Sequence, residues 1–384
     1  MKKCRLSNPT LTIKKKDVFL VVLFFILYIL ISQPGILKYI TLSGAILFSL
    51  ILKGKINLNH YIVMIHAVFY SLYGLLLAFV NMTVDFESVK QLLIYICPGL
   101  FSICFFSLYG KKNGIKLLDI QFVALCMAYS CLFADKIDYS NFSNESQLYG
   151  YIFGAFALLY FWQKRYWWMV IAIAFMFIEN KRIVEFAFVV IMFLSFLIGK
   201  IKKDGQLVFV NKILSALLLI GPFIWMYLCS SGVLEWIFQV LDINSQGRID
   251  GESIWTQAKQ YYDFSPFYLG RGIGWVISWL KMAGSSFFPI LHNDFLAGFI
   301  ELGFLGYIVW IFLFQAIPFI WRKKIYISNI VLLLTGYMFI NFLTDNTYIY
   351  VTWLLPFYSI LLVILYGEDR EKCFAMYYNR RKDK

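Results

Sequence analysis

The chain has 384 residues, of which 61% are hydrophobic and only 15% are charged, and its formal net charge is +13. A soluble domain of this length could not bury so much apolar surface, so the composition indicates a polytopic membrane protein. The positive charge does not indicate nucleic-acid binding, because most of the cations flank apolar runs, as topogenic cations do. The 7 cysteines are scattered and show neither a disulfide framework nor metal-ligand spacing.

The apolar runs predict an all-α protein with about 12 transmembrane helices, if each span needs ~17–25 residues. The first run follows a basic segment and lacks a small-residue cleavage site, so it is predicted to be a retained span and not a signal peptide. No internal repeat is visible. The predicted spans are 18–33, 36–52, 59–80, 91–109, 116–134, 148–163, 166–181, 183–199, 207–229, 293–316, 326–344 and 348–366.

Basic loops alternate with acidic or neutral loops, and this alternation predicts the orientation of the spans. By the positive-inside rule, the basic loops and both termini lie in the cytoplasm. Residues 1–229 then hold the first nine spans, and 230–291 form one large extracytoplasmic loop. Residues 292–366 hold spans ten to twelve, and 367–384 form a basic cytoplasmic tail. At about 60 residues, the large loop is too long to be only a connector.

Several cations are exceptions to this rule, because they lie on the predicted outer side. Such cations beside the membrane suit recognition of a lipid-linked phosphate or diphosphate, and arginine can engage the oxygens bidentately. Local pairing is the alternative, since acidic residues lie within four positions of Arg182 and of Arg248. For Lys259 and Lys281 a solvated face is favoured over a site. The exceptions are Lys181, Arg182, Arg248, Lys259, Arg271 and Lys281.

The tenth span opens with a polar triplet, His292-Asn293-Asp294, at the outer membrane boundary. A histidine gains or loses a proton near neutral pH, so His292 is a candidate acid–base residue. Glu301 lies two helical turns below Asp294 on the same face, and an ionisable group at that depth is a functional candidate. The alternatives are a structural carboxylate at Glu301 and helix capping by Asn293 or Asp294. The glycines at 298, 303 and 306 are predicted to permit close helix packing.

An ordered set of motifs in the second half resembles the O-antigen polymerase and O-antigen ligase superfamily of bacterial envelope glycosyltransferases. The set is Lys181-Arg182 after a span, Gly247-Arg248 with Trp255 seven residues on, the segment 269–274, and the segment 292–296 followed by Glu301-Leu302-Gly303 and Leu305-Gly306. Two departures occur. Asn180-Lys181 replaces a small residue and a serine before the first arginine, and Arg271 stands where a non-basic residue is usual.

The resemblance implies a multi-pass protein of the bacterial inner membrane that acts in lipopolysaccharide or capsule synthesis. Its substrate would be an undecaprenyl-diphosphate-linked oligosaccharide, and membrane lipids and a chain-length regulator protein are the further partners. The reaction would be an inverting glycosyl transfer with no metal and no cofactor. The resemblance gives catalytic roles to His292, Arg248 and Arg182. It gives substrate-binding roles to Arg271, Asn293, Asp294, Glu301 and Trp255.

Four functions remain open at this point. A polymerase of repeat units is the leading hypothesis, and a ligase that transfers polymer to lipid A core is the runner-up within the same chemistry. A lipid-linked oligosaccharide flippase, or another transporter, would place ionisable groups near the middle of several spans and keep its loops small. A structural partner in an export complex would need neither His292 nor the outer arginines.

Overall fold

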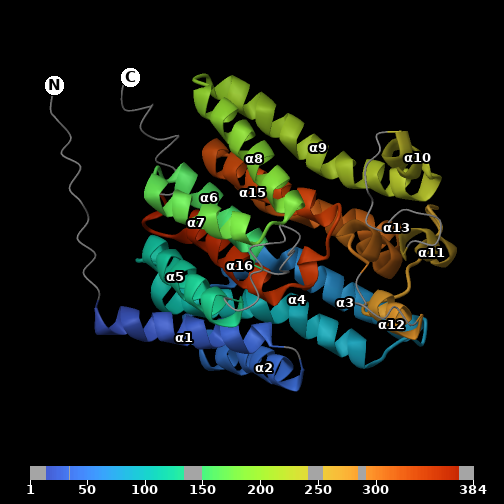
Figure 1. Cartoon of the computed structure of the whole chain (residues 1–384), viewed down its shortest axis with the longest axis horizontal. Helices are drawn as coiled ribbons and strands as arrows, with labels where there is room; N and C mark the ends of the chain where they lie inside the picture. The colour runs from blue at the N-terminus through green and yellow to red at the C-terminus, as the bar shows by residue number, and fades with distance from the viewer. Residues whose placement is uncertain (1–13, 34, 134–148, 241–253, 284–290, 372–384) are drawn as a thin grey trace.

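The computed structural model describes residues 14–33, 35–133, 149–240, 254–283 and 291–371, and within these ranges the regular structure is entirely helical (Figure 1). A helix lies in each of the twelve predicted intervals. The α-helices are α1 Lys15–Ser32, α2 Ile36–Ile51, α3 Ile65–Val80, α4 Phe86–Phe105, α5 Gly114–Phe133, α6 Gly150–Trp162, α7 Tyr166–Ile178, α8 Arg182–Lys200, α9 Asp204–Ser231, α10 Val233–Val240, α11 Ile254–Ala258, α12 Trp275–Met282, α13 Asp294–Phe314, α14 Ala316–Ile320, α15 Ile325–Phe342 and α16 Val351–Tyr366.

Within the described ranges, seven helices are long and apolar enough to cross a bilayer. The prediction of an all-α membrane protein is therefore confirmed at this level, whereas the count of twelve spans stays a prediction. Four further apolar helices, α2, α6, α7 and α16, are shorter. The seven are Leu58–Val80, Phe86–Gly110, Gly114–Phe133, Arg182–Lys200, Asp204–Ser231, Asp294–Phe314 and Ile325–Phe342.

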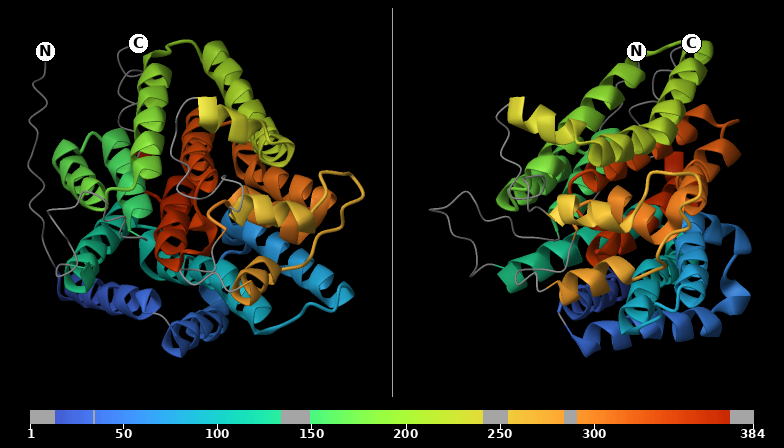
Figure 2. Two further views of the ribbon diagram at one scale, coloured as in Figure 1. Left: turned by 45° about the vertical axis from the view of Figure 1, so that its right-hand side comes forward. Right: turned by 90° about the vertical axis from the view of Figure 1, so that its right-hand side faces the viewer.

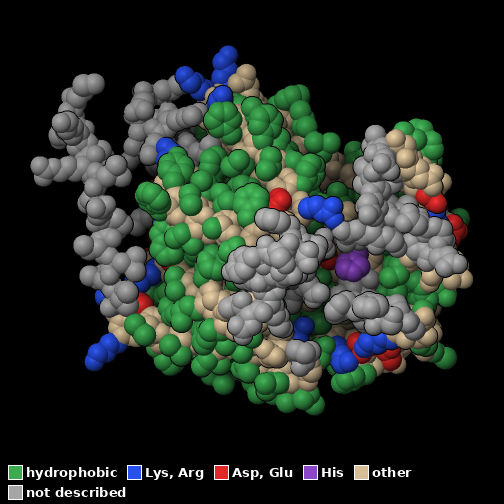
Figure 3. Space-filling view, in the orientation of Figure 1, with side chains coloured by type: hydrophobic (Ala, Val, Ile, Leu, Met, Phe, Trp, Pro, Cys, Tyr) green, Lys and Arg blue, Asp and Glu red, His purple; other side chains and the backbone are tan. Residues whose placement is uncertain are grey.

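The burial pattern separates a central group of helices from a lipid-facing shell. Every residue of α16 from Val351 to Leu365 is buried, because α1, α4, α5 and α6 pack around this helix. In α9, by contrast, only four of the 28 residues are buried, and apolar side chains such as Phe209 and Leu217 are exposed. Figure 3 shows hydrophobic side chains over much of the face it presents. A surface of this kind is stable only in contact with lipid or another apolar partner.

The two ends of the helix bundle differ. At one end Lys116 Nζ, in α5, bonds Asp17 of α1 at 2.6 Å, and the amide of Ile115 bonds Asp369, just after α16, at 3.0 Å. The start of α1 and the end of α16 therefore lie together, as expected for termini on one side of a membrane. The short helices α10, α11 and α12, which belong to the predicted outer loop, lie at the opposite end (Figures 1 and 2).

We expect Lys203 and Gln260, both exposed, to lie on opposite sides of the membrane. In a chain whose natural cysteines have been replaced, a membrane-impermeant maleimide applied to intact cells should label Gln260→Cys and not Lys203→Cys, because the positive-inside rule predicts a cytoplasmic basic loop. After the cells are permeabilised, both variants should be labelled. Labelling of Lys203→Cys in intact cells would contradict the predicted orientation.

Candidate functional site

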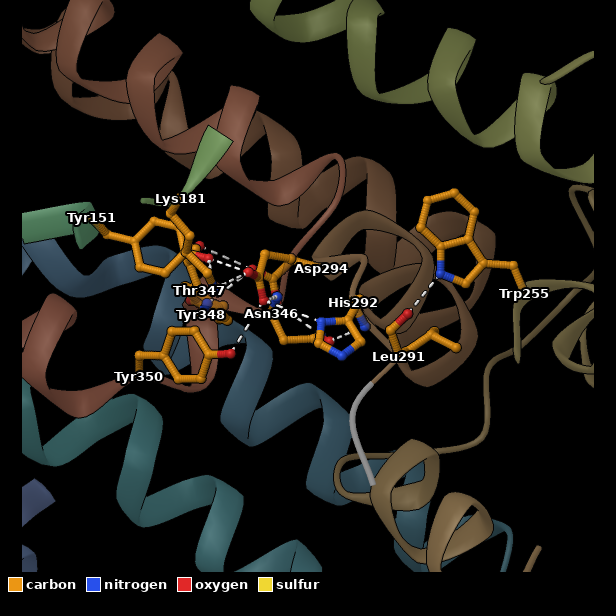
Figure 4. Close-up of polar contacts among 11 residues, drawn as sticks. Tyr151, Lys181, Trp255, Leu291, His292, Asp294, Asn346, Thr347, Tyr348 and Tyr350 are labelled. Carbon is orange, nitrogen blue, oxygen red and sulfur yellow. Dashed lines mark hydrogen bonds and ion pairs between the residues drawn. The ribbon is translucent and has the colours of Figure 1, made fainter. Parts of the chain in front are cut away.

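A buried carboxylate, Asp345, belongs to a polar cluster near the helix ends on the side of the predicted outer loop, and Figure 4 shows its partners Lys181, Tyr151 and Tyr350. Its Oδ2 accepts hydrogen bonds from the Lys181 ammonium and the Tyr151 hydroxyl. Its Oδ1 accepts from the Tyr350 hydroxyl at 3.1 Å and from the amide of Asn346 at 2.8 Å. The Lys181 Nζ also donates to the Tyr151 oxygen at 2.6 Å. Opposite charges and hydroxyl donors thus satisfy this carboxylate within the protein.

His292 lies on the open side of this cluster. Its Nδ1 is buried and lies 3.4 Å from Oδ1 of Asp345, close enough for an ion pair, but it forms no hydrogen bond with the described residues. The His292 side chain is nevertheless 34% exposed, so the rest of the ring faces outward. A carboxylate can only accept a hydrogen bond, so this placement favours a proton on Nδ1 and leaves Nε2 as the free acceptor. Figure 3 shows a histidine at the surface of this face, whereas His60 and His66 are buried.

Four chain segments place these groups. Lys181 is the N-cap residue of α8, directly after the tight turn in which Asn180 has a φ of 47°. Tyr151 belongs to the first turn of α6, and Asp345 lies in the turn between α15 and α16. His292 precedes α13 and has a φ of 55°, in the left-handed region that few residues other than glycine adopt. The cluster is therefore built where helix ends meet, at the side of the bundle on which the outer loop was predicted.

Asp294 joins the polar triplet to the α15–α16 turn. Its carboxylate accepts from the amide of Tyr348 at 2.9 Å, from Thr347 Oγ1 at 3.1 Å and from Asn346 Nδ2 at 3.3 Å. The Asp294 amide bonds the carbonyl of Asp345 at 3.2 Å, and the His292 amide bonds the Asn346 side chain. Because backbone and side chains both connect the two segments, the position of His292 relative to Asp345 is fixed by the fold.

The charge state of Asp345 follows from these contacts. Burial raises the pKa of this carboxyl, but the charge and hydrogen bond of the Lys181 ammonium, together with the nearby His292 ring, outweigh burial, so the pKa lies well below its usual range. The side chains of Lys181 and Asp345 are only 8% and 3% exposed. The cluster therefore holds a buried ion pair whose carboxylate stays ionised at neutral pH and faces the histidine ring.

The three arginines predicted at the site have different positions. Arg182 is exposed in the first turn of α8, beside the buried Lys181. Arg271 is also exposed; its Nε donates to the carbonyl of Tyr261 at 3.2 Å, and its guanidinium carbon lies 5.6 Å from the centre of the Trp275 ring. Those contacts belong to the loop segment before α12, not to the cluster around Asp345. Arg248 lies outside the described residues.

The remaining predicted residues have structural contacts. Glu301 is buried and accepts from the amides of Gly274 and Val276, at 3.0 and 3.2 Å, and from the Tyr70 hydroxyl at 3.0 Å. It therefore ties the start of α12 to α13. Asn293 caps α13, because its Oδ1 accepts from the amide of Leu296 at 3.0 Å. Trp255 donates to the carbonyl of Leu291 at 2.6 Å and so holds the residue before His292.

The glycine-rich segment packs against an interruption in α13. Gly303 has a φ of 69°, and a Cβ there would lie 2.2 Å from the carbonyl carbon of Leu269. Gly270 has a φ of 89°, and a Cβ there would lie 2.4 Å from the amide nitrogen of Gly303. Helix packing was predicted at Gly303, but the close approach there is to a loop. Gly306 does face a helix, because a Cβ there would meet Tyr73 of α3. Only glycine fits both positions.

We expect Gly270→Ala to destabilise the folded protein. The left-handed backbone alone costs on the order of 1–3 kcal/mol, and the clash with backbone atoms of α13 adds to this. The melting temperature, followed by size-exclusion chromatography after heating, should fall by several degrees. Gly44→Ala is the matched control, because no atom lies within 4 Å of a Cβ built there. Equal melting temperatures for the two variants would contradict this account of the segment.

An apolar groove lies beside the cluster, between α8, α9 and α15. Its volume is about 390 Å³, and apolar side chains form almost all of its lining. Leu217 and Ile224 of α9 line it and are exposed, so the groove opens on the lipid-facing surface. At its other end it reaches Phe295, next to Asp294, and Leu343, two residues before Asp345. A lipid chain in this groove would therefore end close to the polar cluster.

No family model, curated protein or solved structure matches this chain. Its chemistry is therefore argued from the site. Sequence reasoning proposed His292 and Asp294 but missed the roles of Asp345, Tyr151 and Tyr350, and it treated Lys181 mainly as the neighbour of Arg182. The polar run from Thr344 to Thr347 between two apolar spans was the available signal.

Proposed function

We propose that the chain is a membrane glycosyltransferase that polymerises oligosaccharide repeat units linked to a polyprenyl diphosphate. One observation carries the proposal: a partly exposed histidine, backed by a buried carboxylate, lies three residues before Phe295, which lines a lipid-accessible apolar groove. A histidine with this support suits general base chemistry on a hydroxyl group. The ordered motifs of the second half, which resemble the polymerase and ligase superfamily, support the same chemistry.

In the proposed reaction, His292 takes the proton of an acceptor sugar hydroxyl through Nε2. The hydroxyl oxygen forms a bond to the anomeric carbon of the donor as the bond from that carbon to the diphosphate oxygen breaks. A single displacement inverts the anomeric configuration, and the polyprenyl diphosphate leaves with the bonding electrons. Asp345 acts as a positioning residue that also stabilises the imidazolium, and Lys181 holds Asp345 in place.

The departing diphosphate gains negative charge, and outer cations would stabilise it. Arg182 is suited to this task, because it is exposed in the first turn of α8, next to Lys181. Arg248 stays a second candidate on sequence grounds alone. The prenyl chain would occupy the apolar groove, whose exposed side allows a long lipid to extend into the bilayer.

Deletion of the gene tests the proposal, with the surface glycan separated on a gel. A polymerase should leave single repeat units attached to their carrier and no ladder, and a plasmid copy should restore the ladder. Loss of all glycan from lipid A core, with lipid-linked polymer retained, would instead identify a ligase. Accumulation of lipid-linked oligosaccharide on the cytoplasmic side would identify a flippase. An unchanged ladder would refute a role in this chemistry.

A further inference from the structure

A second pocket, of about 270 Å³, has in its wall Tyr350, whose hydroxyl donates to Asp345. It is formed by the end of α1, by α2, α4 and α12, and by residues 349–352. Three lysines line it: Lys38 from α2, Lys90 from α4 and Lys281 from α12. The one carboxylate in its lining is Glu87, so three positive charges face one negative charge. Figure 3 shows basic and acidic side chains gathered beside α12.

Glu87 does not neutralise this set. Its Oε1 bonds both Lys90 and Lys281, at 2.7 and 2.6 Å. The ammonium of Lys38 lies 6.0 Å from the centre of the neighbouring Tyr39 ring, and no carboxylate of the described residues forms an ion pair with it. The lysines come from three separate helices, so the fold, and not a local run of sequence, brings them to one cavity. A cavity with this excess of positive charge is suited to an anion.

A buried amide gives a second and independent indication of a ligand. Gln91 is only 2% exposed and lines the pocket, yet its side-chain oxygen has no hydrogen-bond partner. A buried acceptor without a donor costs about 1–3 kcal/mol, so such groups are normally satisfied. A fully ionised carboxylate or phosphodiester cannot donate to this oxygen, whereas a sugar hydroxyl can. The ligand should therefore carry both negative charge and hydroxyl groups.

The pocket is also connected to the cluster around Asp345. Gln91 and Ile349 line this pocket and also line a small neighbouring cavity. The other lining residues of that cavity include Asp294 and Asn346. Tyr350, which donates to Asp345, is part of the pocket wall as well. A saccharide bound here would thus lie next to the cluster, on the side away from the apolar groove.

We propose that this pocket binds an anionic saccharide group, with Lys38, Lys90 and Lys281 around its phosphate or carboxylate and Gln91 accepting from a sugar hydroxyl. The anion has two potential sources, the phosphate that links a glycan to its lipid and an acidic sugar within the glycan. This binding does not depend on glycosyl transfer, so it can be tested even if the proposed function is wrong.

The test measures sugar binding to the full-length protein in phosphatidylcholine nanodiscs by saturation-transfer difference NMR. The probes are N-acetylglucosamine 1-phosphate, glucuronic acid and neutral N-acetylglucosamine, at low ionic strength. At least one anionic probe should bind about tenfold more tightly than the neutral sugar, because the lysines act on its charge. Preference for the sugar phosphate would identify the lipid linkage as the source, and preference for glucuronic acid would identify an acidic sugar. Equal binding of all three probes would overturn the proposal.

Variants assign the binding to this pocket. Lys38→Gln combined with Lys281→Gln should weaken binding of the anionic probe about tenfold, and Glu87 keeps its bond to Lys90 in that variant. Lys38→Arg should retain binding, and Lys259→Gln, which is outside the pocket lining, is the matched control. Gln91→Leu should weaken binding of the sugar phosphate but not of sulfate, which is fully ionised and cannot donate to the Gln91 oxygen. Unchanged sugar-phosphate affinity in the double lysine variant or in Gln91→Leu, with monodisperse protein, would refute the assignment.

Discussion

Replacement of His292 by alanine or glutamine is expected to abolish glycan polymerisation while the protein still inserts into the membrane. A general base contributes roughly 100- to 10,000-fold to the rate, and a hydroxyl nucleophile depends on it. Glutamine keeps most of the size and polarity of the ring but cannot take a proton. The experiment scores polymer on a gel in a strain that lacks the native gene. His60→Gln is the matched control, because that buried histidine packs against Tyr366 at the end of α16, whereas the site lies before the start of that helix.

Long polymer from either His292 variant would end the base assignment. A pH–rate profile of the wild-type protein separates a base from a cationic ligand of the diphosphate. A base must be neutral, so the rate should fall as the solution becomes acidic enough to protonate imidazole. A ligand role predicts the opposite trend, because protonation would strengthen the contact with the diphosphate.

Removal of one partner from the Lys181–Asp345 ion pair is expected to cost about 3–5 kcal/mol of stability, because it leaves a buried charge without compensation. Lys181→Met and Asp345→Asn should therefore both unfold at lower temperature and yield no polymer. The double variant carries neither charge, so it should recover much of the lost stability. It should still lack activity, because Asp345 no longer orients His292.

Thermal unfolding of the wild type, the two single variants and the double variant gives the coupling energy between Lys181 and Asp345 directly. Additive losses in the double variant would contradict a buried pair. A single variant that melts at the wild-type temperature and makes normal polymer would also contradict a buried pair.

The stability of this pair should depend on pH only in acid. The pKa of Asp345 is lowered in the folded protein, so its contribution is fully present above the ordinary value of about 3.8 and is lost as the pH falls below it. Between neutral pH and about pH 5 the difference in melting temperature between the wild type and Asp345→Asn should therefore stay constant. An activity loss on mild acidification would then arise from His292 and not from the ion pair.

The sequence predicted the helices well, because an apolar run long enough to cross a bilayer has few other stable conformations. It also placed Asn293 correctly among the candidate caps, since capping is set by local chemistry. The partnership of Lys181 with Asp345 could not be predicted in this way. The two residues are 164 positions apart, and neither belongs to a motif that names the other. Their contact depends on how helix ends meet in three dimensions.

Some residues singled out by their position in the sequence lie next to a cluster residue or have other bonding partners than expected. The rule on charged loops singled out both Lys181 and Arg182, and the resemblance gave the catalytic role to Arg182, but the side chain that enters the cluster is that of Lys181. Helical spacing put Asp294 and Glu301 on one face, and both are buried. Their partners, however, are backbone amides of other segments, at 348 for Asp294 and at the start of α12 for Glu301. A carboxylate that holds a loop and one that binds substrate have the same pattern in a single sequence.

The proposed polymerase activity is tested most directly with the purified protein in lipid vesicles. A synthetic polyprenyl-diphosphate-linked oligosaccharide is the sole substrate. Mass spectrometry of the products follows chain length and the released lipid diphosphate. The proposed polymerase activity predicts chains that grow by whole repeat units, one polyprenyl diphosphate released for each new glycosidic bond, inverted anomeric configuration, and no growth with His292→Gln. Movement of the substrate across the vesicle membrane without any new glycosidic bond, or growth that is unaffected by His292→Gln, would contradict it.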